Sequence, residues 1–444
     1  MSWNKVKLAH VLKQYRIEHI VQSDREYKQV TISKHDGICF RGYKKGINIG
    51  RKRQFLINLD KYPNTLMFVR QGVDDGAIGI AKNDVNGCIA TENMPMFSIE
   101  NIDKDFLDFV IKSSYFKSEI AKIPTTGTAQ KSIHERLLLQ IEIPYPSIIE
   151  QSEVVSNLRR IESGKNKISS ANTYQLDLLK KLRQQMLRDA VQGKLVPQDP
   201  NDEPASKLLE RIKAAKEQLI REKKIKKDKP LPEIKPEEIP FKIPEIWTWC
   251  RLGEIAYITS GSTPKQEEFI NRGIPYLKMY NLRHQKIDFN YKPQFISEKI
   301  HNGQLKRSRT QAGDLLMNIV GPPLGKLALI PESLPQANFN QAAVLIRPYL
   351  FKEINKWIFW YLNEMSEIKS ISTKGVAGQD NISVTQSTHM RIPLPPLAEQ
   401  LRINTKIEQL MNLYDELEKS IQQNQKYTQD LLQVALKEAL SSAN

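Results

Sequence analysis

Cysteine and long apolar runs are both scarce in this sequence. Its three cysteines, Cys39, Cys88 and Cys250, are odd in number and form no CxxC pair, which excludes a disulfide framework and a cysteine-based zinc site. No segment approaches the roughly 18 apolar residues that a membrane-spanning helix requires. Residues 1–19 carry charges throughout instead of an apolar signal-peptide core. These absences predict a cytoplasmic protein that is not inserted in a membrane.

Recognisable catalytic motifs are also missing. The segment GPPLGKL at 321–327 resembles a phosphate-binding loop, but it is one residue too short between its glycines, and Leu327 stands where Ser or Thr would bind magnesium. His134-Glu135 is not followed by the second histidine of a zinc-binding HExxH helix. Neither a GxGxxG turn nor the Asn-Pro-Pro-Phe/Tyr motif of amino-methyltransferases occurs. The sequence therefore predicts no catalytic residues and no metal site on this chain.

Positive charge is what the chain has in excess. Its 444 residues include 66 Lys and Arg against 50 Asp and Glu, a net charge of +16. Such an excess favours a polyanionic partner, either nucleic acid or an anionic membrane surface. A basic protein with no such partner is the alternative that charge by itself leaves open.

An internal repeat organises the sequence. IPYPSIIEQ, beginning at Ile143, returns as IPLPPLAEQ, beginning at Ile392, an offset of 249 residues. LMFV and LMNI, GAIGI and GKLAL, GTAQKSI and GVAGQDNIS, and KLAHV and RLGEI follow in the same order at nearly the same offset. The chain is therefore predicted to be a tandem duplication.

Each IPxP motif leads into a predicted long helix. Proline favours an extended chain and then permits a helix start. Core-type positions, most of them apolar, recur in alternating steps of three and four residues, which is a heptad seam. They are Val154, Leu158, Ile161, Lys165, Ile168, Asn172, Gln175, Leu179, Leu182 and Met186, with their equivalents 249 residues later. We expect the two helices to pair as an antiparallel coiled coil that separates two globular domains; the alternative packs each helix on its own domain.

This reasoning predicts an α+β fold with two tandem domains related by a pseudo-twofold duplication. The predicted boundaries, in chain order, are recognition domain 1 at 1–142, spacer helix 1 at 143–192, a helical and proline-rich linker at 193–243, recognition domain 2 at 244–391 and spacer helix 2 at 392–444. Helices are also expected at 104–122 and 354–371, late in each domain.

Basic and amide side chains cluster within both domains. Between Arg41 and Arg53 there are six basic residues and no acidic one, with glycines and aromatic residues interleaved. Arg, Lys, Asn and Gln are the residue types that contact phosphates and read purine edges in the major groove. The predicted DNA-binding residues are Arg41, Lys44, Lys45, Arg51, Arg53, Arg70 and Gln130 in domain 1, and Lys265, Gln266, Lys278, Asn281, Arg283, Arg307, Arg309 and Gln379 in domain 2. Because the two sets differ, two different half-sites at a fixed spacing are expected.

The layout resembles the specificity subunit of type I restriction–modification systems. The resemblance covers nearly the whole chain and rests on three features: both IPxPxxxEQ motifs, the segment LRQQMLRDAVQGKLVPQDPNDEPASKLLERI, and IPEIWTWCRLGEI at the start of the second half. It implies that each domain reads one half-site of a bipartite, asymmetric DNA target in phage defence. It further implies two modification subunits that methylate adenine with S-adenosylmethionine, and two restriction subunits that use ATP and Mg²⁺.

On this resemblance the chain itself holds no cofactor and is not an enzyme. Its helices would bind the modification subunits around Glu150, Gln151, Glu399 and Gln400. Two alternatives remain open at this point: a self-contained DNA methyltransferase or nuclease with drifted motifs, and a coiled-coil scaffold that binds protein only.

Overall fold

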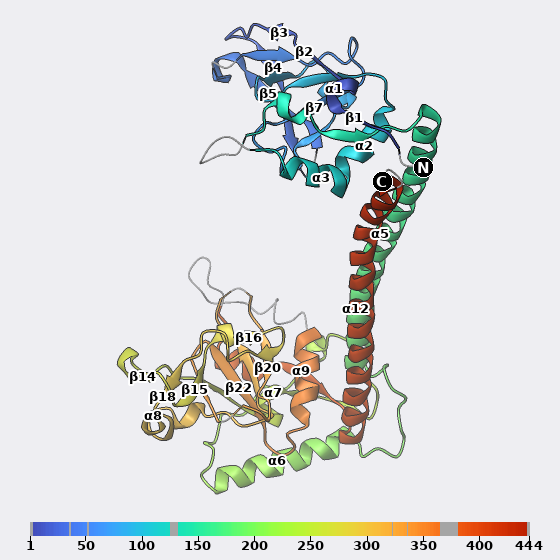
Figure 1. Cartoon of the computed structure of the whole chain (residues 1–444). Helices are drawn as coiled ribbons and strands as arrows, with labels where there is room; N and C mark the ends of the chain where they lie inside the picture. The colour runs from blue at the N-terminus through green and yellow to red at the C-terminus, as the bar shows by residue number, and fades with distance from the viewer. Residues whose placement is uncertain are drawn as a thin grey trace. The chain divides into compact units, whose positions relative to one another are not determined.

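The computed structural model describes residues 3–34, 37–50, 53–124, 132–321, 323–334, 336–364 and 381–441. The chain forms two compact units. Unit 1 comprises Met1–Gln175 with Ser420–Asn444, and unit 2 comprises Leu176–Lys419. Each unit therefore contains one α+β domain and a section of both long helices, α5 (Ile148–Val191) and α12 (Leu397–Ser441) (Figure 1).

Domain 1 is built on three sheets, with strand orders β1-β11, β2-β10-β7-β8 and β3-β6-β9-β4-β5. Its elements are β1 (Lys5–Lys7), α1 (Leu8–Val11), β2 (Leu12–Tyr15), β3 (Glu18–His19), β4 (Glu26–Ser33), β5 (Gly37–Lys45), β6 (Gln54–Leu56), β7 (Thr65–Phe68), β8 (Ile78–Ile80), β9 (Ile89–Thr91), β10 (Met96–Ile99), α2 (Lys104–Lys112), α3 (Ser114–Ala121), α4 (Glu135–Leu138) and β11 (Glu142–Pro144). The helix expected at 104–122 is two helices, because Ser113 ends α2 and caps α3.

Domain 2 contains sheets β12-β23, β13-β22-β19-β20, β14-β18-β15-β21 and β16-β17. Its elements are α6 (Ala205–Arg221), β12 (Thr248–Arg251), α7 (Leu252–Ile255), β13 (Ala256–Ser260), β14 (Phe269–Ile270), β15 (Ile274–Leu277), β16 (Leu282–Arg283), β17 (Lys286–Ile287), β18 (Phe295–Ile296), α8 (Glu298–Asn302), β19 (Leu315–Asn318), β20 (Leu327–Leu329), β21 (Asn338–Phe339), β22 (Ala343–Pro348), α9 (Ile354–Glu364), α11 (Val384–His389) and β23 (Arg391–Leu394). Of the helix expected at 354–371, residues 365–371 lie outside the described residues.

The duplication is visible in the topology. Strand order β2-β10-β7-β8 in domain 1 corresponds, strand for strand along the chain, to β13-β22-β19-β20 in domain 2. In both domains the first strand pairs antiparallel with the strand of the IPxP motif, β1 with β11 and β12 with β23. The predicted α+β duplication is confirmed, and equivalent edges of the repeated sheet can be compared directly.

The two long helices pack antiparallel. In unit 1, Leu158 near the start of α5 shares a core with Leu436 near the end of α12. In unit 2, Leu187 near the end of α5 shares a core with Ile407 near the start of α12. An ion pair joins the helices in unit 2, where the guanidinium of Arg183 lies 2.6 Å from a carboxylate oxygen of Asp415.

Six of the twenty predicted seam positions face outward instead. Buried or half-buried positions recur every seven residues, at 158, 165, 172, 179 and 186 in α5 and 249 residues later in α12. The intervening predicted positions Ile168, Leu182, Leu417 and Leu431 are all more than 40% exposed. A pair of helices buries one stripe of each helix, and the heptad pattern alone did not distinguish that stripe from the neighbouring one.

The linker packs on domain 2. The α6 residues Ala205, Leu208 and Ile212 are buried in the core of unit 2. The proline-rich stretch that follows is held by Arg251, whose guanidinium donates to the carbonyls of Pro232 and Glu233. An almost fully buried arginine thus fixes this proline-rich part of the linker to domain 2.

Candidate nucleic-acid interface

Charged side chains gather at the same end of the strands of the repeated sheet in both units, and this end is called the sheet edge below. In domain 1 this edge is where Tyr15 of β2 pairs with Met96 of β10. In domain 2 it is where Ser260 of β13 pairs with Val344 of β22. Because the topology is duplicated, loops leaving this edge are structurally equivalent even where their sequences differ. This edge is therefore the centre of the candidate interface in each unit.

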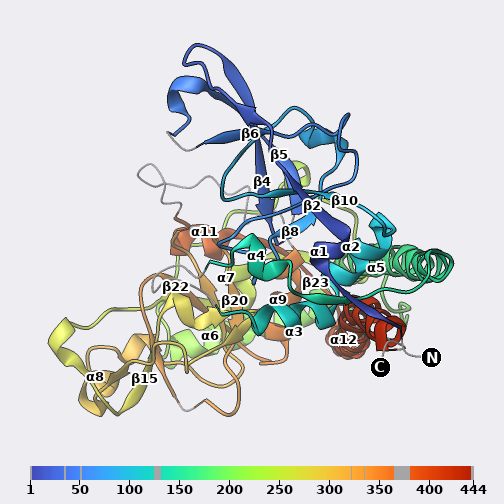
Figure 2. The same ribbon diagram turned by 45° about the horizontal axis from the view of Figure 1, so that its top comes forward.

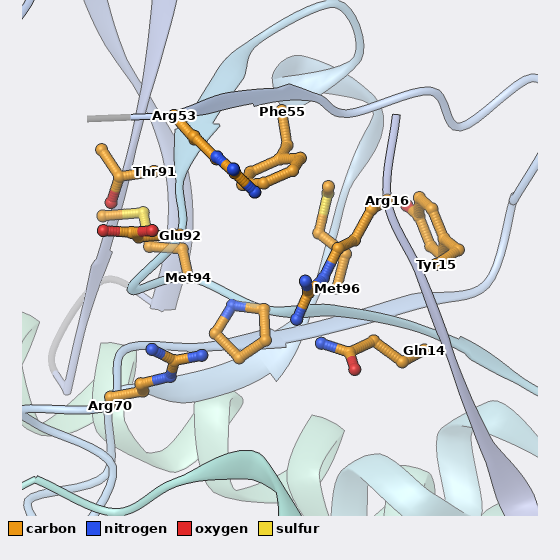
Figure 3. Close-up of a pocket in the computed structure, with 11 residues that line it drawn as sticks. Gln14, Tyr15, Arg16, Arg53, Phe55, Arg70, Thr91, Glu92, Met94 and Met96 are labelled. Atoms are coloured by element: carbon orange, nitrogen blue, oxygen red, sulfur yellow. The ribbon is translucent and has the colours of Figure 1, made fainter. Parts of the chain in front are cut away.

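In domain 1 the edge contains a hollow of about 110 Å³. Arg16 follows β2, Arg53 precedes β6 and Arg70 follows β7, and Figure 3 shows their side chains extending toward one hollow together with Gln14. Phe55, beside Arg53, also lines it. Guanidinium groups with five fixed donors each suit the phosphate oxygens or guanine edges of a nucleic acid.

Glu135 of α4 neutralises part of this charge. Its carboxylate accepts two hydrogen bonds from Arg70, at 2.8 and 2.9 Å, and lies 3.6 Å from the guanidinium of Arg16. Burial by itself would raise the pKa of Glu135, but the hydrogen bonds and the positive charges of Arg70 and Arg16 outweigh it and lower the pKa. Arg70, expected to bind DNA, is thus fixed in an internal ion pair, whereas Arg16 and Arg53 are exposed.

A two-stranded ribbon extends the cationic surface of domain 1. β4 and β5 pair over their whole length, with a bulge beside Gly42, whose φ is +129° (Figure 2). The predicted residues Arg41, Lys44 and Lys45 lie on β5 and are all exposed. A two-stranded ribbon fits the major groove of B-form DNA, so the ribbon is a second contact element of this domain.

In domain 2 the equivalent loop follows β13. A Cβ on Gly261 would lie 2.2 Å from the carbonyl oxygen of Phe339, so only glycine fits this close approach. The hydroxyl of Tyr276 donates to the carbonyl of Ser262 at 2.8 Å, and burial raises the pKa of Tyr276 to about 12. The loop is therefore held rigidly and presents Lys265, which is exposed, to solvent.

The other predicted residues of domain 2 differ in their accessibility. Gln266, Arg283 and Arg307 are exposed, while Lys278 is half-buried with its ammonium 5.3 Å from the centre of the Phe269 ring. Arg309 is also half-buried, and its guanidinium donates to the carbonyl of His301.

Asn281 has a structural role instead of the expected DNA-reading one. It is 1% exposed, and its amide group donates to the carbonyls of Asp288 and Tyr291. Its side-chain oxygen accepts from the backbone N–H of Lys278. The side chain that was expected to read bases therefore closes the loop that supports its neighbours. The predicted residues Arg51, Gln130 and Gln379 lie outside the described residues.

The glutamine of each IPxPxxxEQ motif is buried and ties the motif to itself. The Gln151 amide donates to the carbonyl of Pro146, and the Gln400 amide donates to the carbonyl of Pro395, at 2.9 and 2.8 Å. These bonds fix the turn from the strand into the long helix in both copies. The expected docking role is thereby corrected for both glutamines, since neither reaches the surface.

The two glutamates of the motif have diverged. Glu150 is exposed and caps α5 by accepting from the backbone N–H and hydroxyl of Ser147. Glu399 is fully buried and accepts hydrogen bonds from the indole of Trp247 and the amide of Gln198. Only Glu150 of the four predicted docking residues is therefore accessible to a partner in this structure.

Apolar side chains of the long helices offer a partner surface that the motif residues do not. The exposed large apolar residues of α5 and α12 are Ile148, Ile149, Ile168, Tyr174, Leu178, Leu182, Leu401, Leu413, Leu417, Tyr427, Leu431 and Val434. Those at four-residue steps, Tyr174, Leu178 and Leu182 on α5 and Leu413 and Leu417 on α12, form exposed apolar stripes that are candidate protein-binding surfaces.

Two other kinds of site are absent from the part of the chain that the structure describes. Those residues include no group of three or more His, Cys, Asp or Glu side chains placed to hold a metal ion. They also include no helix with the length and apolar character needed to cross a membrane.

Sequence reasoning missed Arg16 and the converging hollow of domain 1. The repeat itself carried the signal, because Arg16 follows β2 just as the segment with the predicted residues Lys265 and Gln266 follows β13. Aligning the two copies strand by strand would have placed Arg16 at an expected contact edge. Clustering along the sequence could not find it, because Arg16, Arg53 and Arg70 come from three separate loops.

The fold and the site together define a class of protein. Its members are duplicated α+β proteins with a cationic edge in each copy and two antiparallel long helices. The family model described as "Type I restriction modification DNA specificity domain" matches residues 244–426. The chain is 28% identical to the EcoAI specificity subunit of Escherichia coli, over 97% of this chain and 74% of that protein. It is likewise 28% identical to the Escherichia coli EcoEI specificity subunit, over 100% of this chain and 74% of that protein.

Solved structures show the same fold. The HsdS subunit of Thermoanaerobacter tengcongensis superimposes with a TM-score of 0.58 at 18% identity, covering 100% of this chain and 97% of that chain. A chain from a study of complex assembly and conformational transition in a type I restriction–modification system gives a TM-score of 0.62 at 17% identity, with 99% and 97% covered. Residues 244–426 thus match the type I DNA specificity domain, and the whole chain is similar to type I restriction–modification specificity subunits.

Proposed function

We propose that this chain reads a bipartite, asymmetric DNA sequence and directs partner subunits to it for adenine methylation or ATP-dependent cleavage. The observation that carries the proposal is the shared sheet edge. It presents Arg16 and Arg53 in domain 1 and Lys265 and Arg307, which contacts the Ser262 hydroxyl, in domain 2, so the two domains carry different contact groups at this edge. Two different readers in one chain fit a target with two different halves.

The proposed partners account for chemistry that this chain's sequence does not supply. Two modification subunits would dock on the exposed apolar stripes of α5 and α12 and bring S-adenosylmethionine. Two restriction subunits would bring ATP and Mg²⁺. The chain itself would be non-catalytic, and its DNA target would place it in the cytoplasm.

Charge reversal in the domain 1 hollow tests DNA recognition. We expect Arg16→Glu combined with Arg53→Glu to weaken binding of duplex DNA about 10- to 100-fold. The slope of log K against log salt should flatten by about one for each phosphate that the protein no longer neutralises. The measurement is a fluorescence-anisotropy titration at several salt concentrations. Arg160→Glu combined with Lys167→Glu, which makes the same total charge change at exposed positions of α5, is the matched control and should change binding little.

The alternatives predict other results. A protein-only scaffold would bind DNA weakly, with the same salt slope in both variants. A self-contained enzyme would turn over DNA when the purified chain alone is given S-adenosylmethionine or Mg²⁺. For the proposed function, deleting the gene should remove methyladenine from one split, asymmetric motif across the host genome.

A further inference from the structure

Unusual backbone conformations cluster beside the β16–β17 hairpin of domain 2. Its two turn residues, His284 and Gln285, have φ values of 48° and 60°, and nearby Lys292 has a φ of 51°. They are three of the five non-glycine residues with positive φ in the described ranges. Glycine or asparagine is the usual occupant of such a two-residue turn. When residues with side chains are kept in this conformation at the tip of a loop, this indicates that the side chains have a function.

The hairpin forms one wall of an open hollow of about 490 Å³. Tyr280, Tyr291 and Lys326 also line it, and Figure 1 places β16 beside β20, with which it is in contact. The guanidinium of Arg283 stacks 4.2 Å from the centre of the Tyr291 ring and lies 3.7 Å from a carboxylate oxygen of Asp288. Arg283 is thereby held in place at the base of an exposed tip.

An amide pair completes the wall. The Gln285 side-chain amide donates to the side-chain oxygen of Asn363 in α9 at 2.6 Å. This bond leaves a carbonyl oxygen on Gln285 and an NH₂ group on Asn363 to face the hollow. One acceptor beside one donor complements adenine, which presents N7 as an acceptor and N6–H as a donor in the major groove. Guanine presents two acceptors there and would oppose the Gln285 oxygen.

We infer that the β16–β17 hairpin enters the major groove and that Gln285, positioned by Asn363, reads an adenine in the half-site of domain 2. Arg283 and Lys326 supply the neighbouring phosphate contacts. A two-stranded ribbon has the width for this groove, and residues 283–286 are all exposed. The inference rests on the proposed function. It adds that the β16–β17 hairpin makes the contact, that Gln285 is the reading residue and that adenine is the base.

The experiment selects binding sites from a randomised duplex DNA library with the full-length chain. We expect wild type to enrich a split motif, and Gln285→Ala to lose its preference for adenine at one position by about 10- to 100-fold while the other positions are kept. Asn363→Ala should weaken the same position. Gln218→Ala, which removes an amide from the outer helix α6, is the control and should leave the motif unchanged.

Gln285→Gly separates a contact from a folding defect. Glycine relieves the positive φ, so this variant should unfold at a slightly higher temperature than wild type and still lose the adenine preference. If wild type selects a split motif and both Gln285→Ala and Gln285→Gly select the same motif, the inference is overturned while the proposed function stands. If wild type selects no motif at all, the proposed function fails, and the inference fails with it.

Discussion

Ile407→Asp is expected to release α12 from domain 2. Ile407 is fully buried in the core of unit 2, near Leu187 of α5. The substitution removes a large apolar side chain and puts an unpaired carboxylate among apolar groups, a loss of about 4 kcal/mol or more in the free energy of unfolding. Urea unfolding followed by circular dichroism measures the loss, and hydrogen exchange along α12 locates it.

Leu417→Asp is the matched control for this change. It lies on the same helix, receives the same new charge and is 46% exposed, so we expect it to change stability by about 0.5 kcal/mol or less. It should instead weaken binding of a modification subunit to the apolar stripe. Equal destabilisation by the two substitutions would contradict the assignment of buried and exposed stripes on α12.

Glu399→Ala is expected to destabilise unit 2 by about 2 to 3 kcal/mol. The change leaves the indole N–H of buried Trp247 without its acceptor, and an unsatisfied buried donor carries its full desolvation cost. Thermal and urea unfolding measure the effect. Glu150→Ala, at the equivalent position of the first repeat, removes only an exposed helix cap and should have a smaller effect, confined to unit 1.

The difference in stability between wild type and Glu399→Ala is expected to depend on pH. Burial raises the pKa of Glu399 above its ordinary value of 4.5, although the hydrogen bonds from Trp247 and Gln198 oppose the shift. The folded state therefore keeps a proton that the unfolded chain has lost. The contribution of this bound proton to the free energy of unfolding is fully present below the pKa that Glu399 has in the unfolded chain. It is lost as the pH rises through the pKa that Glu399 has in the folded protein. The advantage of wild type over Glu399→Ala should thus shrink as the pH rises through the raised pKa of Glu399, and a growing advantage would contradict the burial of this carboxyl.

The repeat made the architecture predictable, because topology depends on the order of elements and both copies carried the same order. Side-chain roles were less predictable. The family resemblance placed Gln151 and Gln400 in the docking surface, but each is buried and donates to the carbonyl of its own motif's proline. Arg16 was missed because it joins the other arginines only through folding.

Domain 1 does not complete its core with the residues nearest to it in sequence. The core of unit 1 includes Leu432, Leu436 and Leu440 from α12. During synthesis, residues 1–175 leave the ribosome long before these leucines exist, so Leu158 and its neighbours stay uncovered throughout translation of the second half. The domain that is made first is thus the last to be finished, and the nascent chain is exposed to misfolding and chaperone capture over that interval.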